Sequence, residues 1–487
     1  MFSGSAPPSG YAVIVYLHSG DFSTGSPFEI NPFQFVFKQK VIVVTVAYRL
    51  NILGFFTTLD GESPGNFGLM DQAAALEWVQ KNIKAFSGDP DNVTLMGHGS
   101  GATSVCIHLT SREWSNNLFH KAIIMSGTSL GSTSIRPASY YAKALDRTAY
   151  AFSCFRRPTV QLMECLRRLD AKFIIENAPE LKWGPIIDAG LSMRTAPFIS
   201  EDPEMLIEGG FLRKVPILIG FTNQEEVYEL IAENMVEQGI SLDLYEMMIN
   251  EIISNDFSKF ENNETMCAGN NQIAMEAVNF LYRPYPPTED KIQLRNFYLN
   301  FLNDRKYLAP TIGLAAHMAM QAETFVYRFD LKPRTMIDIP EDIGVPHGFE
   351  QIFLWGLPYW GTQSDIAWDN ADKRVSDIIM TMWANFAKYT NPTQLGVYIK
   401  WDNFTHENPS ILIIDRSFNM SDLHSLNHHA IKFWNEYYPS VLSFAAACCN
   451  VSESDGTNPT NVTHYYTFTL CLLLGQVLVF MYHVTLT

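Results

Sequence analysis

The stretch Val93-Thr94-Leu95-Met96-Gly97-His98-Gly99-Ser100-Gly101-Ala102 has the pattern of a strand, a sharp turn and the start of a helix. Such a bend holds a nucleophilic side chain when small residues stand two positions before and two positions after it, because the bend crowds the backbone. Gly97 and Gly101 have this spacing, and Gly99 lies midway between them. The sequence therefore predicts the backbone of a nucleophile elbow without its nucleophile.

Short apolar runs rich in β-branched residues recur on both sides of this bend, between segments of helical periodicity. The runs lie at 11–16, 41–48, 93–96, 122–125, 216–219, 324–329 and 411–414. Runs that are apolar on both faces are typical of the central strands of a parallel sheet covered by helices. Helices are predicted around 70–81 and around 375–386, and further helices with polar joints over 230–306. This alternation predicts an α/β fold.

Composition narrows the class of protein. Of the 487 residues, 47% are hydrophobic and 17% are charged, which excludes a disordered, collagenous or coiled-coil chain. The formal net charge of −17 argues against a nucleic-acid binder, since phosphate binding needs a basic surface.

Several motifs close to the bend carry a family resemblance. They are Gly65-Asn66-Phe67-Gly68-Leu69, Gly88-Asp89-Pro90 and Ser126-Gly127, together with the bend itself. From about residue 11 to residue 438 the chain resembles the type-B carboxylesterase and cholinesterase family. The resemblance implies an α/β-hydrolase fold, with a mostly parallel central sheet flanked by helices.

The resemblance also assigns the positions of a catalytic triad. The acid falls at Glu225, the histidine at His347 and the nucleophile at Gly99, which has no hydroxyl group for the histidine to activate. In the glycine-rich oxyanion loop Gly20 is retained, whereas Asp21 replaces a second glycine. A carboxylate there opposes the negative charge that the loop would stabilise. We therefore expect no catalysis, with Glu225 and His347 kept as a hydrogen-bonded pair.

Ser100 is the one residue near Gly99 that could substitute for a nucleophile. Ser100 lies one residue late, and a helical step turns its side chain away from His347, so a packing or capping role is expected. Ser104 is expected to be structural, and His98 is assigned no chemistry. An active carboxylesterase that uses Ser100 at an atypical elbow remains an alternative.

The seven cysteines form no C-x-x-C pattern, so no zinc site and no other metal or cofactor is expected. Spacing alone leaves Cys154 and Cys165 open between a disulfide and free thiols, and the family resemblance implies the disulfide. No pairing is assigned to Cys267, Cys448 or Cys449. Glycosylation sequons begin at Asn92, Asn263, Asn403, Asn419, Asn450 and Asn461.

We expect three parts: a carboxylesterase-like body over 1–446, truncated at its start, a glycosylated stalk over 447–464 and a hydrophobic tail over 465–487. The tail contains no Asp, Glu, Lys or Arg and is long enough to cross a bilayer. A transmembrane helix, a lipid-anchor signal and a buried core helix remain alternatives for it. Residues 1–8 contain no signal peptide, and we expect that the natural amino terminus precedes them.

A body without a nucleophile, on a stalk with a membrane tail, is similar to the cholinesterase-like adhesion molecules of the gliotactin and neuroligin branch. This implies a cell-surface protein that binds extracellular protein partners. The resemblance further implies a homodimer through the segments 369–390 and 426–438, although Val375, Ile379, Phe433 and Trp434 could serve the core instead. A ligand-binding pseudoenzyme is the third hypothesis.

Overall fold

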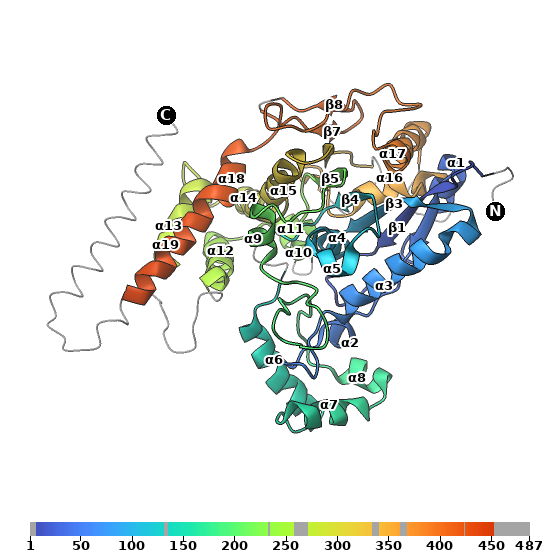
Figure 1. Ribbon diagram of the computed structural model, residues 1–487. Coiled ribbons are helices and arrows are strands. Elements are labelled where there is room, and N and C mark those ends of the chain that lie inside the picture. The colour runs from blue at the N-terminus through green and yellow to red at the C-terminus, as the bar shows by residue number, and fades with distance from the viewer. Residues whose placement is uncertain are drawn as a thin grey trace. The chain divides into compact units, whose positions relative to one another are not determined.

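The computed structural model describes residues 6–130, 135–231, 234–257, 271–333, 340–360, 368–422 and 424–451. The chain divides into two compact units (Figure 1). The first unit comprises Met1–Glu225 and Pro310–Leu426, and the second comprises Glu226–Ala309 and Asn427–Thr487.

An eight-stranded sheet in the order β2-β1-β3-β4-β5-β6-β7-β8 forms the centre of the first unit. All neighbouring strands are parallel except β7 and β8, which pair antiparallel. The strands are β1 (Tyr11–Leu17), β2 (Ile42–Thr45), β3 (Gly88–His98), β4 (Lys121–Met125), β5 (Ile217–Thr222), β6 (Thr324–Phe329), β7 (Leu412–Ile414) and β8 (Asn419–Met420). The predicted α/β-hydrolase fold class is confirmed.

The central strands are buried on both faces, as their sequence predicts. Val13, Ile14 and Val15 of β1 are fully buried, as are the four apolar residues of β4. Each predicted apolar run overlaps a strand. The sequence did not predict β8, because this two-residue strand is exposed or half-buried and carries no apolar run.

Helices surround this sheet within the first unit. They are α1 (Phe33–Gln39), α2 (Asn51–Phe55), α3 (Phe67–Asn82), η1 (Ile83–Phe86), α4 (Ser100–Thr110), α5 (Arg112–Ser115), α6 (Ala138–Ala151), α7 (Thr159–Arg167), α8 (Ala171–Asn177), α9 (Pro203–Glu208), α15 (Ala309–Ala319), α16 (Phe349–Leu354), η3 (Leu357–Tyr359) and α17 (Asn370–Tyr389). The two helices predicted at 70–81 and 375–386 are α3 and α17. A capping box of Asp369 and Asp372 starts α17, and its residues Val375 and Ile379 are buried in the unit's own core.

The second unit is helical, as the sequence predicts for 230–306. It contains α10 (Val227–Ile231), α11 (Met235–Gln238), α12 (Leu242–Phe257), α13 (Asn271–Tyr282), α14 (Lys291–Asn303), the π-helical η2 (Asp304–Leu308) and η5 (Phe433–Tyr437), α18 (His428–Lys432) and α19 (Tyr438–Val451). A buried polar cluster joins the two chain segments that form this unit. Asp256 pairs with Arg305 at 2.5 Å and accepts a hydrogen bond from the Tyr438 hydroxyl at 2.7 Å. Phe433 and Trp434 are buried in this unit.

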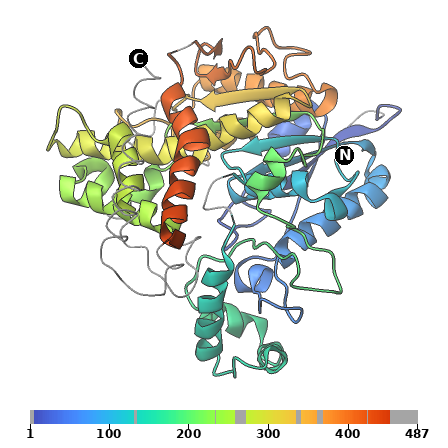
Figure 2. The same ribbon diagram turned by 60° about the vertical axis from the view of Figure 1, so that its left-hand side comes forward.

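The carboxyl-terminal part of the chain is only partly described. Helix α19, drawn in red in Figure 2, continues to Val451, five residues into the range expected to be a stalk. The rest of the expected stalk and the whole tail at 465–487 lie outside the described residues. Within the described ranges, no helix combines the length and apolar character needed to span a bilayer.

Candidate functional site

The bend between β3 and α4 has the geometry of a nucleophile elbow. Gly99 adopts φ 54° and ψ −121°, a conformation that residues with side chains rarely adopt. A Cβ atom on Gly97 would lie 2.2 Å from the carbonyl oxygen of Gly101, and one on Gly101 would lie 2.2 Å from the carbonyl oxygen of Leu17. The crowding that the sequence implied is therefore present, and it requires glycine at both flanking positions.

The structure brings Glu225 and His347 together beside this bend. Nδ1 of His347 lies 2.6 Å from Oε2 of Glu225, whose Oε1 accepts a hydrogen bond from the backbone N–H of Thr222 at 2.6 Å. The Glu225 side chain is fully buried and that of His347 is 26% exposed. A Cβ atom on Gly99 would lie 3.1 Å from Nε2 of His347. The three positions therefore have the arrangement of a triad, and the hydroxyl group is absent.

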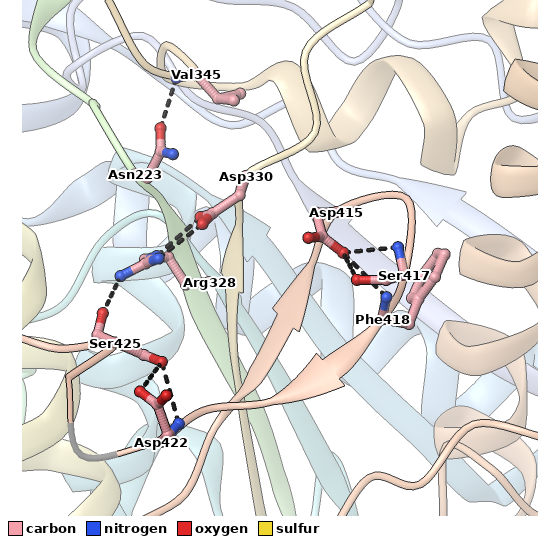
Figure 3. Close-up of polar contacts among 9 residues, drawn as sticks. All are labelled: Asn223, Arg328, Asp330, Val345, Asp415, Ser417, Phe418, Asp422 and Ser425. Atoms are coloured by element: carbon pink, nitrogen blue, oxygen red, sulfur yellow. Dashed lines mark hydrogen bonds and ion pairs between the residues drawn. The ribbon is translucent and has the colours of Figure 1, made fainter.

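The loop that carries His347 is held against the end of β5. Oδ1 of Asn223 accepts a hydrogen bond from the Val345 N–H at 2.6 Å, a contact visible at the top of Figure 3. The N–H of His347 donates to the Glu225 carbonyl oxygen at 3.3 Å. Figure 3 also shows Arg328 in a double contact with Asp330, which anchors the end of the adjacent strand β6. The hydrogen bonds from Val345 to Asn223 and from His347 to Glu225 position the histidine without help from a nucleophile.

The loop expected to be the oxyanion loop contains a second residue, Ser19, that crowds the elbow and that the sequence analysis missed. A Cβ atom on Gly99 would lie 2.9 Å from Cβ of Ser19, which is closer than non-bonded carbon atoms approach. Ser19 stands in the motif His18-Ser19-Gly20-Asp21-Phe22, so its position was visible in the sequence but its contact was not. Asp21 has φ 51° and is exposed, so water screens its carboxylate. Ser19 therefore obstructs the site sterically, and Asp21 has a weaker electrostatic effect than we expected.

Ser100 and Ser104 have surroundings consistent with packing roles. Ser100 is the first residue of α4 and is 6% exposed. The Ser104 hydroxyl donates to the Ser100 carbonyl oxygen at 3.1 Å and accepts from Nε2 of Gln72 at 3.2 Å. Both hydrogen bonds are buried, which accounts for a polar residue inside this helix.

A buried acid that the sequence analysis did not single out lies behind the triad positions. Nε2 of His98 lies 3.5 Å from Oε1 of Glu350, and the Ser126 hydroxyl donates to the same oxygen at 3.1 Å. The rings of His98 and His347 are 4.4 Å apart. Burial raises the pKa of Glu350 to about 7, with the nearby charge of Glu225 adding to the shift. Burial lowers the pKa of His98 well below its usual value, so this imidazole stays neutral.

Replacing Glu350 with glutamine is expected to stabilise the protein at high pH. A carboxyl group whose pKa rises from 4.5 to about 7 on folding supplies stability that is present below 4.5 and lost as pH rises through 7. Glutamine keeps the oxygen that accepts from Ser126 and never ionises. We expect Glu350→Gln to be about 2 kcal/mol more stable than wild type at pH 8 and nearly equal at pH 5. Urea unfolding at both pH values measures this, and an equal difference at the two values would contradict it.

The structure joins Cys154 to Cys165 by a disulfide between the end of α6 and α7. Cys106 is a free, buried thiol. Cys267 lies outside the described residues, as do the side chains of Cys448 and Cys449.

Glycosylation stays a prediction. The exposure of the asparagine side chains indicates which sequons a glycan could occupy. Asn92 is half-buried in β3, where its amide nitrogen donates to the Lys388 carbonyl oxygen at 3.4 Å. Asn403 and Asn419 are exposed. Asn263, Asn461 and the side chain of Asn450 lie outside the described residues. We expect glycans at Asn403 and Asn419 and none at Asn92, and site-resolved glycopeptide mass spectrometry of protein secreted from animal cells tests this. A fully occupied Asn92 would contradict it.

Comparison with known proteins agrees with this geometry. The profile of the Carboxylesterase family matches residues 4–434. Neuroligin-2 of Mus musculus is 27% identical over 454 residues, which cover 88% of this chain and 51% of the relative. Neuroligin-3 is 30% identical over 404 residues in both Mus musculus and Homo sapiens, which cover 80% of this chain and 46% and 44% of those relatives. The chain spans about half the length of the curated relatives it matches.

Proposed function

The chain belongs to the carboxylesterase family, and from that premise we propose that it is a non-catalytic member, which acts in cell adhesion by binding extracellular protein partners. The proposal rests on one observation: Gly99 has no side chain, and it lies beside the hydrogen-bonded pair of Glu225 and His347. Acyl transfer in this family's mechanism starts with attack by a hydroxyl group that the histidine deprotonates. This site has the base and the acid, but it has no atom that can attack.

The proposed adhesion role rests on the similarity of the chain to known adhesion proteins. The relatives that match are neuroligins, and the chain resembles the cholinesterase-like adhesion molecules in lacking the nucleophile. A protein of this fold without catalytic activity still has a large outer surface that can bind partners. The fold alone does not determine what that surface binds. We therefore propose a protein at the cell surface, attached to the membrane through the tail at 465–487.

Incubation with a fluorophosphonate probe is expected to leave the protein unlabelled, and hydrolysis of a short acyl ester is expected to stay at the rate in buffer. An active carboxylesterase in the same assay provides the control. Ser100 directly follows Gly99, and covalent labelling there would overturn the proposal in favour of an esterase with an atypical elbow. Turnover well above buffer would overturn it as well.

A homodimer is part of the same proposal. The apolar residues of the two expected dimer segments, Val375 and Ile379 of α17 and Phe433 and Trp434 of η5, are buried within their own units. A dimer contact on these segments must therefore use their remaining exposed faces. Light scattering of the purified protein is expected to give about twice the chain mass of 55.1 kDa, and a monomer mass at micromolar concentration would contradict this part of the proposal.

A further inference from the structure

A helical lobe of the first unit, which we call the disulfide lobe, comprises Ala138–Asn177 with α6, α7, α8 and the Cys154–Cys165 bond. These three helices lie together and are drawn in teal in Figures 1 and 2. The inner faces of α6 and α7 bury Tyr141, Leu145 and Leu162 in a core cluster that also contains Phe55 and Trp183. The lobe is therefore a fixed part of its unit, and its outer surface is built on rigid elements.

The lobe carries a charge opposite to that of the chain. It contains seven Lys and Arg residues against four Asp and Glu residues, a net charge of +3, whereas the whole chain has −17. Two of the four acids pair inside the lobe, Asp146 with Arg156 and Glu176 with Lys172. A third, Asp170, accepts hydrogen bonds from backbone N–H groups at the start of α8. The fourth, Glu164, is exposed on α7 and forms no ion pair with any described residue, so the lobe keeps an excess of positive charge.

Four exposed arginines of the lobe form no ion pair with any described residue: Arg147, Arg157, Arg167 and Arg168. The disulfide joins the two short segments that carry three of them. Arg157 follows Cys154 by three residues, Arg167 and Arg168 follow Cys165 by two and three, and the two cysteine Cα atoms are 6.0 Å apart. The lobe therefore exposes unpaired positive charge on an otherwise acidic protein.

The same lobe also exposes large apolar side chains to water. Phe155 is 80% exposed and directly follows Cys154, and Tyr150, near the end of α6, is 88% exposed. Phe173 and Ile175 of α8 are 47% and 55% exposed. Aromatic residues and arginine are the types enriched in protein–protein interfaces, where they provide most of the binding energy. A sulfated polysaccharide would be bound by the charges alone and gives no reason for the exposed aromatic rings.

We propose that the disulfide lobe is a docking surface for a segment of a partner protein that carries acidic side chains next to apolar or aromatic ones. The arginines pair with the carboxylates in charge-assisted hydrogen bonds, and the rings of Phe155 and Tyr150 cover the apolar side chains. This inference adds the chemistry of a partner to the proposed adhesion function and rests on it. The two proposals can be refuted separately. Esterase activity at the elbow would refute the non-catalytic function, and a lack of binding at the lobe would refute the docking surface.

The test measures binding of the full chain to a random copolymer of glutamate and tyrosine, with polyglutamate and heparin as competing probes. We expect the copolymer to bind more tightly than polyglutamate at 150 mM salt. The double change Arg167→Glu and Arg168→Glu should weaken copolymer binding by about tenfold or more, and Phe155→Ser by about fivefold. All three side chains are exposed, so the thermal unfolding midpoint should not change.

A matched control reverses two exposed lysines outside the lobe, Lys81→Glu and Lys84→Glu, which produces the same change in net charge. Copolymer binding should stay within about twofold of wild type in this control. An equal loss in the control would overturn the proposal, as would equal binding of polyglutamate, because either result shows only general attraction of charge. Lobe-dependent binding of heparin without the copolymer would assign the surface to a polysaccharide. Self-association that depends on the lobe and excludes the copolymer would assign it to a second copy of the chain.

Discussion

Replacing Gly101 with alanine is expected to destabilise the first unit by about 3 kcal/mol or more, although alanine normally favours a helix by about 1 kcal/mol over glycine. The reversed sign has a local cause. The added Cβ atom would lie 2.2 Å from the carbonyl oxygen of Leu17 and 2.7 Å from that of His18, and both contacts are with backbone that cannot rotate away. Relief would require α4 to move away from β1, which would open the centre of the sheet.

Chemical denaturation followed by tryptophan fluorescence measures this loss. Gly61→Ala is the matched control, since its added Cβ atom would have only the carbonyl oxygen of Leu191 near it, at 3.5 Å. We expect the control to lie within about 0.5 kcal/mol of wild type. If Gly101→Ala were no less stable than the control, the close approach at the elbow would not exist in the folded protein.

Reintroducing the missing hydroxyl by Gly99→Ser alone is expected to give neither fluorophosphonate labelling nor ester hydrolysis. The new Cβ atom would meet Ser19 Cβ at 2.9 Å, and it would hold φ 54° only under strain. The double change Gly99→Ser and Ser19→Gly removes this contact and places a hydroxyl group beside Nε2 of His347. We expect labelling to appear first in that double variant.

Adding Asp21→Gly to the double variant tests the electrostatic part of the same argument. A functioning oxyanion donor contributes about 10²–10³ in turnover, but the exposure of Asp21 should reduce the gain to about tenfold. The control adds His347→Ala, which should abolish labelling in every combination. A single Gly99→Ser variant as active as the triple variant would show that the hydroxyl group was the sole defect. A double variant that stays unlabelled would show that the obstruction at Ser19 does not explain the expected lack of activity.

The elbow shows which features of the site could be predicted from the sequence. The spacing of Gly97, Gly99 and Gly101 is local, so the bend and the missing hydroxyl were both visible along a few residues. The contact of Ser19 with position 99 joins residues 80 positions apart, and that of His98 with Glu350 joins residues 252 positions apart. The hydrophobic periodicity of a sequence reports only on residues a few positions apart, so neither contact could be predicted from it.

The outer surface shows the same division. The overall charge of −17 was evident from composition, but it concealed a basic lobe in which a disulfide joins two short segments that carry arginines. Likewise, the apolar stripe of α17 predicted a helix correctly but did not show whether it faced the core or a second subunit. The chain folds this stripe into its own core.

The sequence by itself determined the α/β architecture and the glycine at the sharp bend, because strand and helix patterns and the residue at a bend depend on neighbours along the chain. Only the tertiary structure decided that Glu225 and His347 still meet, that Ser19 occupies the space beside them and that unpaired arginines gather on one lobe. These are contacts between distant segments, and their distances are set by how the whole sheet and its helices pack.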